Sequence, residues 1–129
     1  MALQIGKKWT KRIKVTPEMT AAACGSGALE VFGTPFLAML FENACCELLQ
    51  GELDPGMTTV GTYLNFEHTS PTPVGAEVWA EVELTEIDRK AFTFRVEGFD
   101  EKGSIGGGTH GRFAVNGEKF LKKAQEKLQ

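Results

Sequence analysis

The chain has 129 residues, of which 42% are hydrophobic and 24% charged, and its formal net charge is −3. This length allows one domain with a substantial core, which we place at residues 1–129, and it excludes two such domains. The acidic balance gives no basis for nucleic-acid binding. The first residues lack the long apolar stretch of a signal peptide, so we expect no membrane association.

Three cysteines, two of them adjacent at Cys45 and Cys46, do not form a disulfide framework. Neither a Cys-x-x-Cys nor a His-x-x-x-His spacing occurs, which argues against a zinc site. Reduced thiols packed in an apolar segment are typical of a cytoplasmic protein.

The first third of the chain predicts a strand followed by a long loop. Residues 9–15 alternate loosely between apolar and basic side chains, which indicates a strand. Residues 16–33 are rich in alanine and glycine and predict a loop with one short helical turn. A loop this long in a compact domain is functional or is ordered by what it covers, and its position suits a lid.

Residues 34–50 predict the helix around which the chain is organised. Thr34 suits the N-cap, Pro35 the first helical position and Gly51 the C-terminal stop. Its apolar residues cover nearly every direction: Phe36, Leu37, Ala38, Met39, Leu40, Phe41, Ala44, Cys45, Cys46, Leu48 and Leu49. A helix that is apolar all round is normally wrapped by other structure, and this one is too short and too interrupted by polar residues to span a membrane.

Four strands joined by short connections follow, and an amphipathic helix comes last. We place the strands at residues 57–68, 77–87, 91–99 and 104–115, and the helix at residues 118–128. Short connections make neighbouring strands antiparallel. The sequence therefore predicts an α+β domain in which an antiparallel sheet curls around one long helix.

Two residues stand out as candidates for acid–base chemistry. Glu42 lies in the middle of the apolar helix, where a carboxylate is either catalytic, on an unwrapped strip of surface, or tied to a neighbouring subunit. Counted by alternation, His68 shares the core face with Val60, Leu64 and Phe66. Glu42 and His68 are thus candidates to meet, although a structural histidine is the alternative.

Thr34 either caps the helix or contributes its hydroxyl to a site. Eight residues separate Thr34 from Glu42, which is about 12 Å along a regular helix. Both cannot touch one reacting atom. Either His68 lies between them, or they serve sites that are shared across a subunit interface.

The Gly106-Gly107-Gly108 run lies in a strand and lacks the lysine and helix of a phosphate loop. It predicts a bulge or a close approach by another backbone or a ligand. His110 has no evident partner and receives a structural or solvent-facing role. Arg112 is one of several basic residues that could meet an anionic ligand tail, although such residues are usually solvated.

Several motifs together resemble the hotdog-fold thioesterases, and among them the fluoroacetyl-CoA thioesterase-like group. They are Glu30-Val31-Phe32-Gly33-Thr34 before the helix, Glu42 within it, Val60-Gly61-Thr62, His68-Thr69-x-x-Thr72-Pro73-x-Gly75, and Gly108-Thr109-His110-x-Arg112. The resemblance extends over residues 5–120. It implies a hotdog fold and hydrolysis of an acyl-coenzyme A thioester without metal or other cofactor. It also implies a homodimer, or a dimer of dimers, whose active site lies near the subunit interface.

Carried over by position, the resemblance makes Thr34, Glu42 and His68 the catalytic residues. Gly61 matches a glycine whose backbone N–H helps hold the thioester carbonyl. In addition, we expect Phe32, Phe36 and Arg112 to contact the substrate. Glu42 then either attacks the carbonyl or activates water, His68 carries the proton, and Thr34 orients His68 or the substrate.

The group's fluoroacetyl-specific enzyme has a phenylalanine-lined lid, whereas residues 24–29 here are small and glycine-rich, with Ala28 at the position of a lid phenylalanine. We therefore expect a small or short-chain acyl group other than fluoroacetyl. A non-catalytic acyl-CoA-binding module is the alternative function, although such a module has no need of an acid–base pair. A hotdog hydratase is a third alternative, but its usual Asp and His at close spacing are missing.

Overall fold

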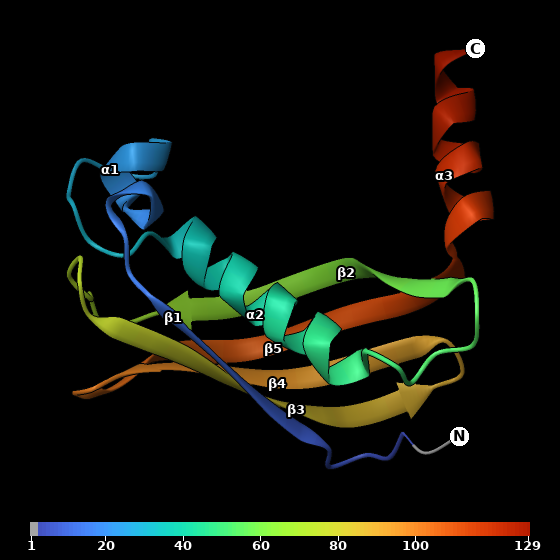
Figure 1. The fold of residues 1–129 in the computed structure, drawn as a ribbon, viewed down its shortest axis with the longest axis horizontal. Coiled ribbons are helices and arrows are strands. Elements are labelled where there is room, and N and C mark those ends of the chain that lie inside the picture. The colour runs from blue at the N-terminus through green and yellow to red at the C-terminus, as the bar shows by residue number, and fades with distance from the viewer. Residues whose placement is uncertain (1–2) are drawn as a thin grey trace.

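A computed structural model describes residues 3–129 as one antiparallel sheet with a long helix against it (Figure 1). The strands are β1 (Lys8–Lys14), β2 (Met57–His68), β3 (Glu77–Asp88), β4 (Ala91–Asp100) and β5 (Gly103–Asn116). The helices are η1 (Pro17–Met19), α1 (Ala21–Cys24), α2 (Thr34–Leu49), α3 (Gly117–Gln125) and η2 (Glu126–Leu128). The five strands are ordered β1-β3-β4-β5-β2, and every neighbouring pair is antiparallel. The predicted α+β architecture is confirmed.

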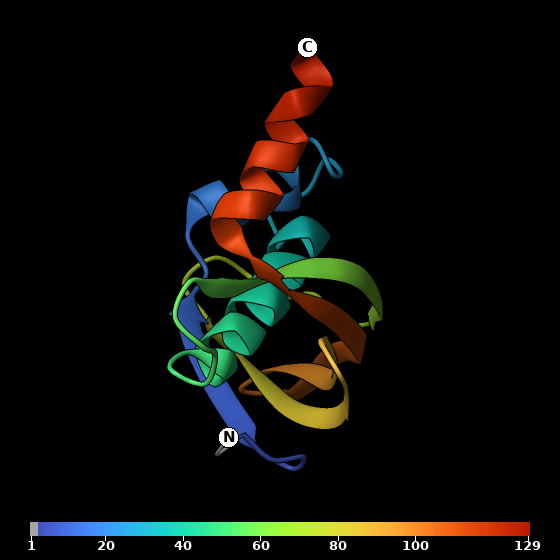
Figure 2. The same ribbon diagram turned by 90° about the vertical axis from the view of Figure 1, so that its right-hand side faces the viewer.

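The core lies between α2 and the concave face of the sheet. Leu37, Leu40 and Phe41 of α2 are buried there, and the inward residues of β3 and β4 alternate with exposed or half-buried ones as their sequences predict. The sheet curls around α2 in Figure 2 but does not enclose it. One side of the helix stays open, so that Met39 is 50% exposed. The sheet therefore curls around the helix as expected and wraps only the side of α2 that faces it.

The cysteines also differ from expectation. Cys45 is buried in the core, and burial raises the pKa of its thiol, which keeps it protonated. Cys46 lies on the open side of α2 and is exposed, as is Cys24 in α1. Only one of the three thiols is packed as the sequence suggested.

A β-bulge in β2 changes which side chains face the helix. The pairing of β2 with β5 shifts register between Gly61 and Tyr63, so an extra residue interrupts the alternation. Val60 pairs with the exposed Phe113 and faces outward, whereas Gly61 faces Glu42 of α2. Simple alternation had placed Val60 on the core face and Gly61 on the outer face, and both assignments are corrected. A one-residue slip reverses every side chain on one side of the bulge.

The glycine run in β5 accommodates two neighbouring backbones. A Cβ at Gly106 or Gly108 would collide with the carbonyl oxygens of Glu67 and Asn65 in β2. A Cβ at Gly107 would lie 2.6 Å from the carbonyl oxygen of Val96 in β4. The predicted close approach by another backbone is confirmed.

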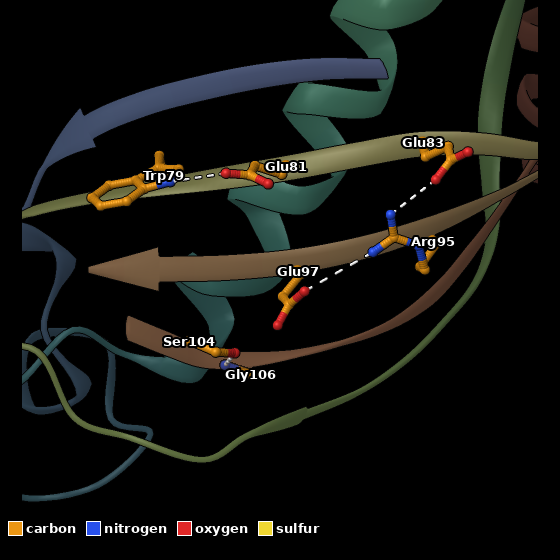
Figure 3. A network of polar contacts seen from close by, with 7 residues as sticks. All are labelled: Trp79, Glu81, Glu83, Arg95, Glu97, Ser104 and Gly106. Carbon is orange, nitrogen blue, oxygen red and sulfur yellow. Dashed lines mark hydrogen bonds and ion pairs between the residues drawn. The ribbon is translucent and has the colours of Figure 1, made fainter. Parts of the chain in front are cut away.

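The convex face of the sheet is a solvated surface of charge pairs, shown in Figure 3. Arg95 donates to Glu83 at 2.9 Å and lies 3.9 Å from Glu97, and the Trp79 indole N–H donates to Glu81 at 3.3 Å. Exposed pairs of this kind contribute little to stability. His110 and Arg112, in contrast, are buried on the side of the sheet that faces α2.

Two features are relevant to assembly, the outer edge of β2 and the helix α3. Within residues 3–129, β2 has no strand along its outer edge. Beyond β5, α3 projects away from the sheet, and its Phe120 and Leu121 are exposed (Figure 1). No helix among the described residues is both long and apolar enough to cross a membrane.

Candidate active site

Thr34 and His68 form one half of the candidate site. The Thr34 hydroxyl oxygen lies 2.8 Å from His68 Nδ1 and is hydrogen-bonded to it. The sequence suggested that Thr34 caps α2, but Gly33 is the N-cap and, in the described chain, no side chain caps that end. Thr34 is the first helical residue and Pro35 the second. The Thr34 hydroxyl therefore does not cap the helix and instead forms a hydrogen bond with His68.

His68 ends β2 in a half-buried environment. The edge of the Phe32 ring packs against the imidazole, with ring centroids 6.4 Å apart. Burial lowers the pKa of His68 below its ordinary value, against a smaller opposing effect of the Ser70 backbone. Its Nε2 atom is buried and finds no hydrogen-bond partner among residues 3–129. An unpaired buried nitrogen is costly unless another group completes it, so this atom is positioned to meet a substrate or a second chain.

The predicted lid segment lines a cleft beside this pair. The cleft has a volume of about 270 Å³ and is lined by Ala21, Ser26, Val31, Phe32, Thr34, His68, Thr69, Ser70 and Pro71. Isolated bridges from Thr20 to Phe32 and from Val31 to Pro73 hold the segment in place. The expected short helical turn is α1.

Glu42 lies in a second cluster, together with Gly61, His110 and Arg112. A Cβ built on Gly61 would lie 3.3 Å from Glu42 Oε2, 3.4 Å from Arg112 Nη1 and 3.5 Å from His110 Cε1. Three polar side chains thus face one point that stays open because residue 61 is glycine. A carboxylate and a guanidinium on either side of an open point suit the binding and activation of a carbonyl group.

Arg112 is buried and held from three directions. Its Nε donates to the Thr59 hydroxyl at 2.9 Å and its Nη2 to the Thr59 carbonyl at 3.0 Å. Its Nη1 lies 3.2 Å from His110 Nε2, and His110 Nδ1 lies 2.7 Å from the Tyr63 carbonyl oxygen. The bulge and the alternation of β5 bring these groups to the same face.

His110 therefore does have partners, and the expectation that it lacks them is corrected. It is 1% exposed and contacts both Arg112 and β2. Sequence reasoning also missed Thr59. The available signal was a spacing of two residues in strands, which places His110 beside Arg112 and Thr59 beside Gly61.

The two clusters do not meet within one chain. Thr34 contacts His68, whereas Glu42 contacts Gly61, seven residues earlier in β2. At the usual rise, the Gly61–His68 segment is about 23 Å long. The expected approach of Glu42 to His68 is therefore wrong for a single chain, and His68 does not lie between Thr34 and Glu42.

The residues predicted to bind the substrate also lie in different places. Phe32 lines the cleft beside His68, and Arg112 belongs to the Glu42 cluster. Phe36 was expected at the substrate, but it lines another cavity of about 110 Å³ with Met39 and Ile13. The cause is its position two residues after Thr34, which turns it toward a different side of the helix.

Comparisons with known proteins agree on one family. The family model described as fluoroacetyl-CoA-specific thioesterase matches residues 15–118. The fluoroacetyl-CoA thioesterase of Streptantibioticus cattleyicolor is 31% identical over 131 aligned positions, which cover 97% of this chain and 94% of that protein.

Solved structures give the same result. A structure of the fluoroacetyl-CoA thioesterase superposes with a TM-score of 0.93 at 31% identity, covering 98% of each chain. A hotdog-like protein from Thermanaerovibrio acidaminovorans, 18% identical, superposes with a TM-score of 0.90 over 98% of this chain and 94% of that one. The expected hotdog fold is confirmed. The chain belongs to the fluoroacetyl-CoA-specific thioesterase family, and it is a thioester hydrolase.

Proposed function

We propose that this enzyme hydrolyses small acyl-CoA thioesters in sites that two copies of the chain build together. Each site would combine Glu42, Gly61 and Arg112 of one copy with Thr34 and His68 of the other. The observation that carries the proposal is the separation of these groups into two clusters along β2, whose outer edge has no neighbouring strand among residues 3–129.

Pairing of β2 with its own copy would join the two clusters. A two-fold axis that crosses the outer edge of β2 between Gly61 and His68 brings each Gly61 toward the His68 of the second copy. Both residues face the α2 side of the sheet, so the His68 imidazole of one copy enters the open space over Gly61 of the other. Such a pairing also covers a long edge strand, which proteins otherwise have to protect.

In this arrangement the Glu42 carboxylate meets the thioester carbonyl over Gly61. It either attacks the carbonyl carbon or removes a proton from an attacking water. The Gly61 N–H and the Arg112 guanidinium stabilise the negative charge that develops on the carbonyl oxygen. When the C–S bond breaks, coenzyme A leaves as a thiolate. The water that completes the hydrolysis in either route gives up one proton, which passes through His68 to the thiolate sulfur. The acyl group is released as the free acid, after hydrolysis of an anhydride in the first route.

His68 carries that proton in the proposed mechanism. Its lowered pKa leaves it neutral at pH 7, so it can accept a proton, and its Nε2 atom is unpaired within one chain. The Thr34 hydroxyl fixes the ring through Nδ1.

The substrate range follows from the lid. The cleft of about 270 Å³ is lined by small residues of this segment, Ala21 and Ser26, and Ala28 is exposed rather than inserted into the cleft. Residues 24–29 contribute no bulky side chain to the cleft, so they do not restrict the acyl group to fluoroacetyl. We propose acetyl and other short chains as substrates.

The direct test is thiol release from a panel of CoA esters: acetyl, fluoroacetyl, propionyl, butyryl, octanoyl and phenylacetyl. We expect the highest kcat/KM among the short chains, with fluoroacetyl-CoA inside their range rather than far above it. Glu42→Ala serves as the control and should abolish turnover. Strict preference for fluoroacetyl-CoA would contradict the proposed range, and full turnover in folded Glu42→Ala would contradict the assigned carboxylate.

A further inference from the structure

His110 is a buried titratable group that the proposed mechanism does not use. It lies in β5 with its ring stacked on Phe94, at a centroid distance of 6.2 Å and an interplanar angle of 30°. Its two nitrogens contact the Tyr63 carbonyl oxygen at 2.7 Å and Arg112 Nη1 at 3.2 Å. Both nitrogens are therefore engaged by groups whose hydrogen-bonding roles are fixed.

Those fixed roles determine where the proton lies. A carbonyl oxygen only accepts, so His110 Nδ1 must carry the hydrogen and donate it to Tyr63. A guanidinium only donates, so His110 Nε2 must accept from Arg112. The imidazole that satisfies both neighbours is neutral and protonated at Nδ1.

Of the Arg112 nitrogens, the one bonded to His110, Nη1, is the one that faces the open point over Gly61. Thr59 accepts from Nε and Nη2 of Arg112, which leaves Nη1 to His110. Nη1 is also the atom that lies 3.4 Å from the open point over Gly61, opposite Glu42 Oε2. The hydrogen bond to His110 uses one of the two hydrogens on Nη1 and leaves the other for a ligand.

We propose that His110 is a positioning residue, which holds the Arg112 guanidinium over Gly61 and releases it on protonation. This inference rests on the proposed function, in which Glu42 and Gly61 surround the reacting carbonyl. A protonated His110 would place an N–H and a positive charge against the Nη1 hydrogens at 3.2 Å. The hydrogen bond would be lost, and the guanidinium would be pushed away from its place.

The surroundings keep His110 neutral near pH 7. Burial lowers its pKa most, and the Arg112 charge on β5 lowers it further. The Tyr63 carbonyl on β2 and the Glu42 carboxylate on α2 act in the opposite direction but do not reverse the shift. The Phe94 ring on β4 contributes an apolar face without charge.

Nitrogen NMR of the enzyme tests the tautomer without any turnover. At pH 7.5 we expect His110 Nδ1 to have the shift of a protonated nitrogen and Nε2 that of an unprotonated one. On acidification, the Arg112 side-chain signals should move with the midpoint of His110. They should stop titrating in His110→Gln and should still titrate in the matched control His68→Gln. An Nε2-protonated His110, or an Arg112 signal that ignores His110, overturns the inference.

Kinetics test the positioning itself. His110→Phe keeps the ring but loses the acceptor, and we expect kcat to fall about 10- to 100-fold with a smaller change in KM, because a small misplacement of a catalytic group is costly. His110→Gln restores an acceptor near the Nε2 position and should recover part of that loss.

The outcomes separate this inference from the function on which it rests. An unaltered kcat in His110→Phe overturns it. If His110→Phe does not fold, the comparison uses His110→Gln and Thr59→Ala, the second of which removes a different hydrogen bond to Arg112. The inference is overturned as well if His110→Gln does not retain more activity than Thr59→Ala. Absence of turnover in the wild-type enzyme would instead refute the proposed function, and the NMR experiment would still decide the role of His110.

Discussion

The Thr34 hydroxyl is hydrogen-bonded to His68 Nδ1 at 2.8 Å because Thr34 is the first residue of α2 and Gly33 takes the N-cap position. A threonine that caps a helix contributes about 1 kcal/mol to stability, and its replacement by alanine loses most of that contribution. Thr34 is in a different situation, since its oxygen fixes the imidazole instead. Its replacement should therefore affect turnover more than stability.

Thr34→Ala tests this distinction. We expect a loss of kcat of about 10- to 100-fold because the His68 ring is no longer oriented for proton transfer. The free energy of unfolding should change by less than about 0.5 kcal/mol, as for a surface substitution outside a cap. Thr34→Ser retains the hydroxyl and is the matched control. A stability loss typical of a cap, with normal kcat, would contradict the interpretation.

Mixed dimers test whether sites combine two chains. Glu42→Ala and His68→Ala should each be inactive alone, and their mixture should regain activity, because one site of each mixed dimer has all its groups. Random exchange between two-fold dimers makes half of them mixed, with one intact site of two, so recovery should approach about one quarter of wild type.

The matched control for that experiment is a mixture of Thr34→Ala with His68→Ala. These two residues belong to the same cluster, so every site in the mixed dimer lacks one of them and activity should stay low. Equal recovery in both mixtures, or a monomeric mass by light scattering at micromolar concentration, would refute the shared site.

Gly61→Ala tests the open point beside Glu42. The new Cβ would occupy the space that faces Glu42 Oε2 and Arg112 Nη1. We expect kcat/KM to fall about 100-fold, since the carbonyl loses its place, which is a loss similar to removing an oxyanion-hole donor. Thermal unfolding should be nearly unchanged because residue 61 does not have a positive φ.

Gly98→Ala provides the opposite control. Its Cβ would lie 3.0 Å from Leu37 Cδ1 and 3.3 Å from Ile105 Cγ1, in the core between α2 and the sheet. Overpacking of this kind costs about 1–3 kcal/mol. We expect a lower melting temperature with kcat preserved at 25 °C. If Gly61→Ala and Gly98→Ala behaved alike, the effect at Gly61 would be structural.

The two histidines predict how stability depends on pH. Burial lowers the pKa of both His68 and His110 in the folded protein, so the unfolded chain takes up their protons first as pH falls. Their contribution is complete above the unfolded value, about 6.5, and it is lost as pH falls through their lowered folded pKa values. Urea unfolding between pH 8 and pH 5 should show this decline. His110→Gln should flatten it, and an equally steep decline in the His68→Gln, His110→Gln double variant would contradict the assignment.

Local periodicity was sufficient for most elements of the fold. The alternation in β3 and β4 predicted their inward faces, and the start and stop signals around residues 34–51 located α2 within one residue at each end. The motifs that resemble the thioesterase family directed attention to Thr34, Glu42, Gly61 and His68. Strand alternation and helix-end signals depend on residues that are close together in the sequence, which is why they can be read from it.

Alternation misled at the bulge in β2, where a single extra residue moved Gly61 to the α2 side and Val60 to the outer face. The pairing of His110 with Arg112 was visible as a spacing of two residues, but its meaning depended on Tyr63 and Thr59 of the neighbouring strand. Contacts between strands β2 and β5 involve residues about 50 positions apart, and no local pattern fixes their register.

The sequence by itself determined the helix, the antiparallel strands and the residue types capable of thioester chemistry, because side-chain periodicity and helix-end signals act over a few residues. Only the tertiary structure decided how those residues are grouped. It placed Thr34 with His68 and Glu42 with Gly61 and Arg112, and it left the edge of β2 open between them. The physical reason is geometric: eight residues of helix place Thr34 and Glu42 about 12 Å apart, and seven residues of strand place Gly61 and His68 about 23 Å apart, so the two contacts lie at different points.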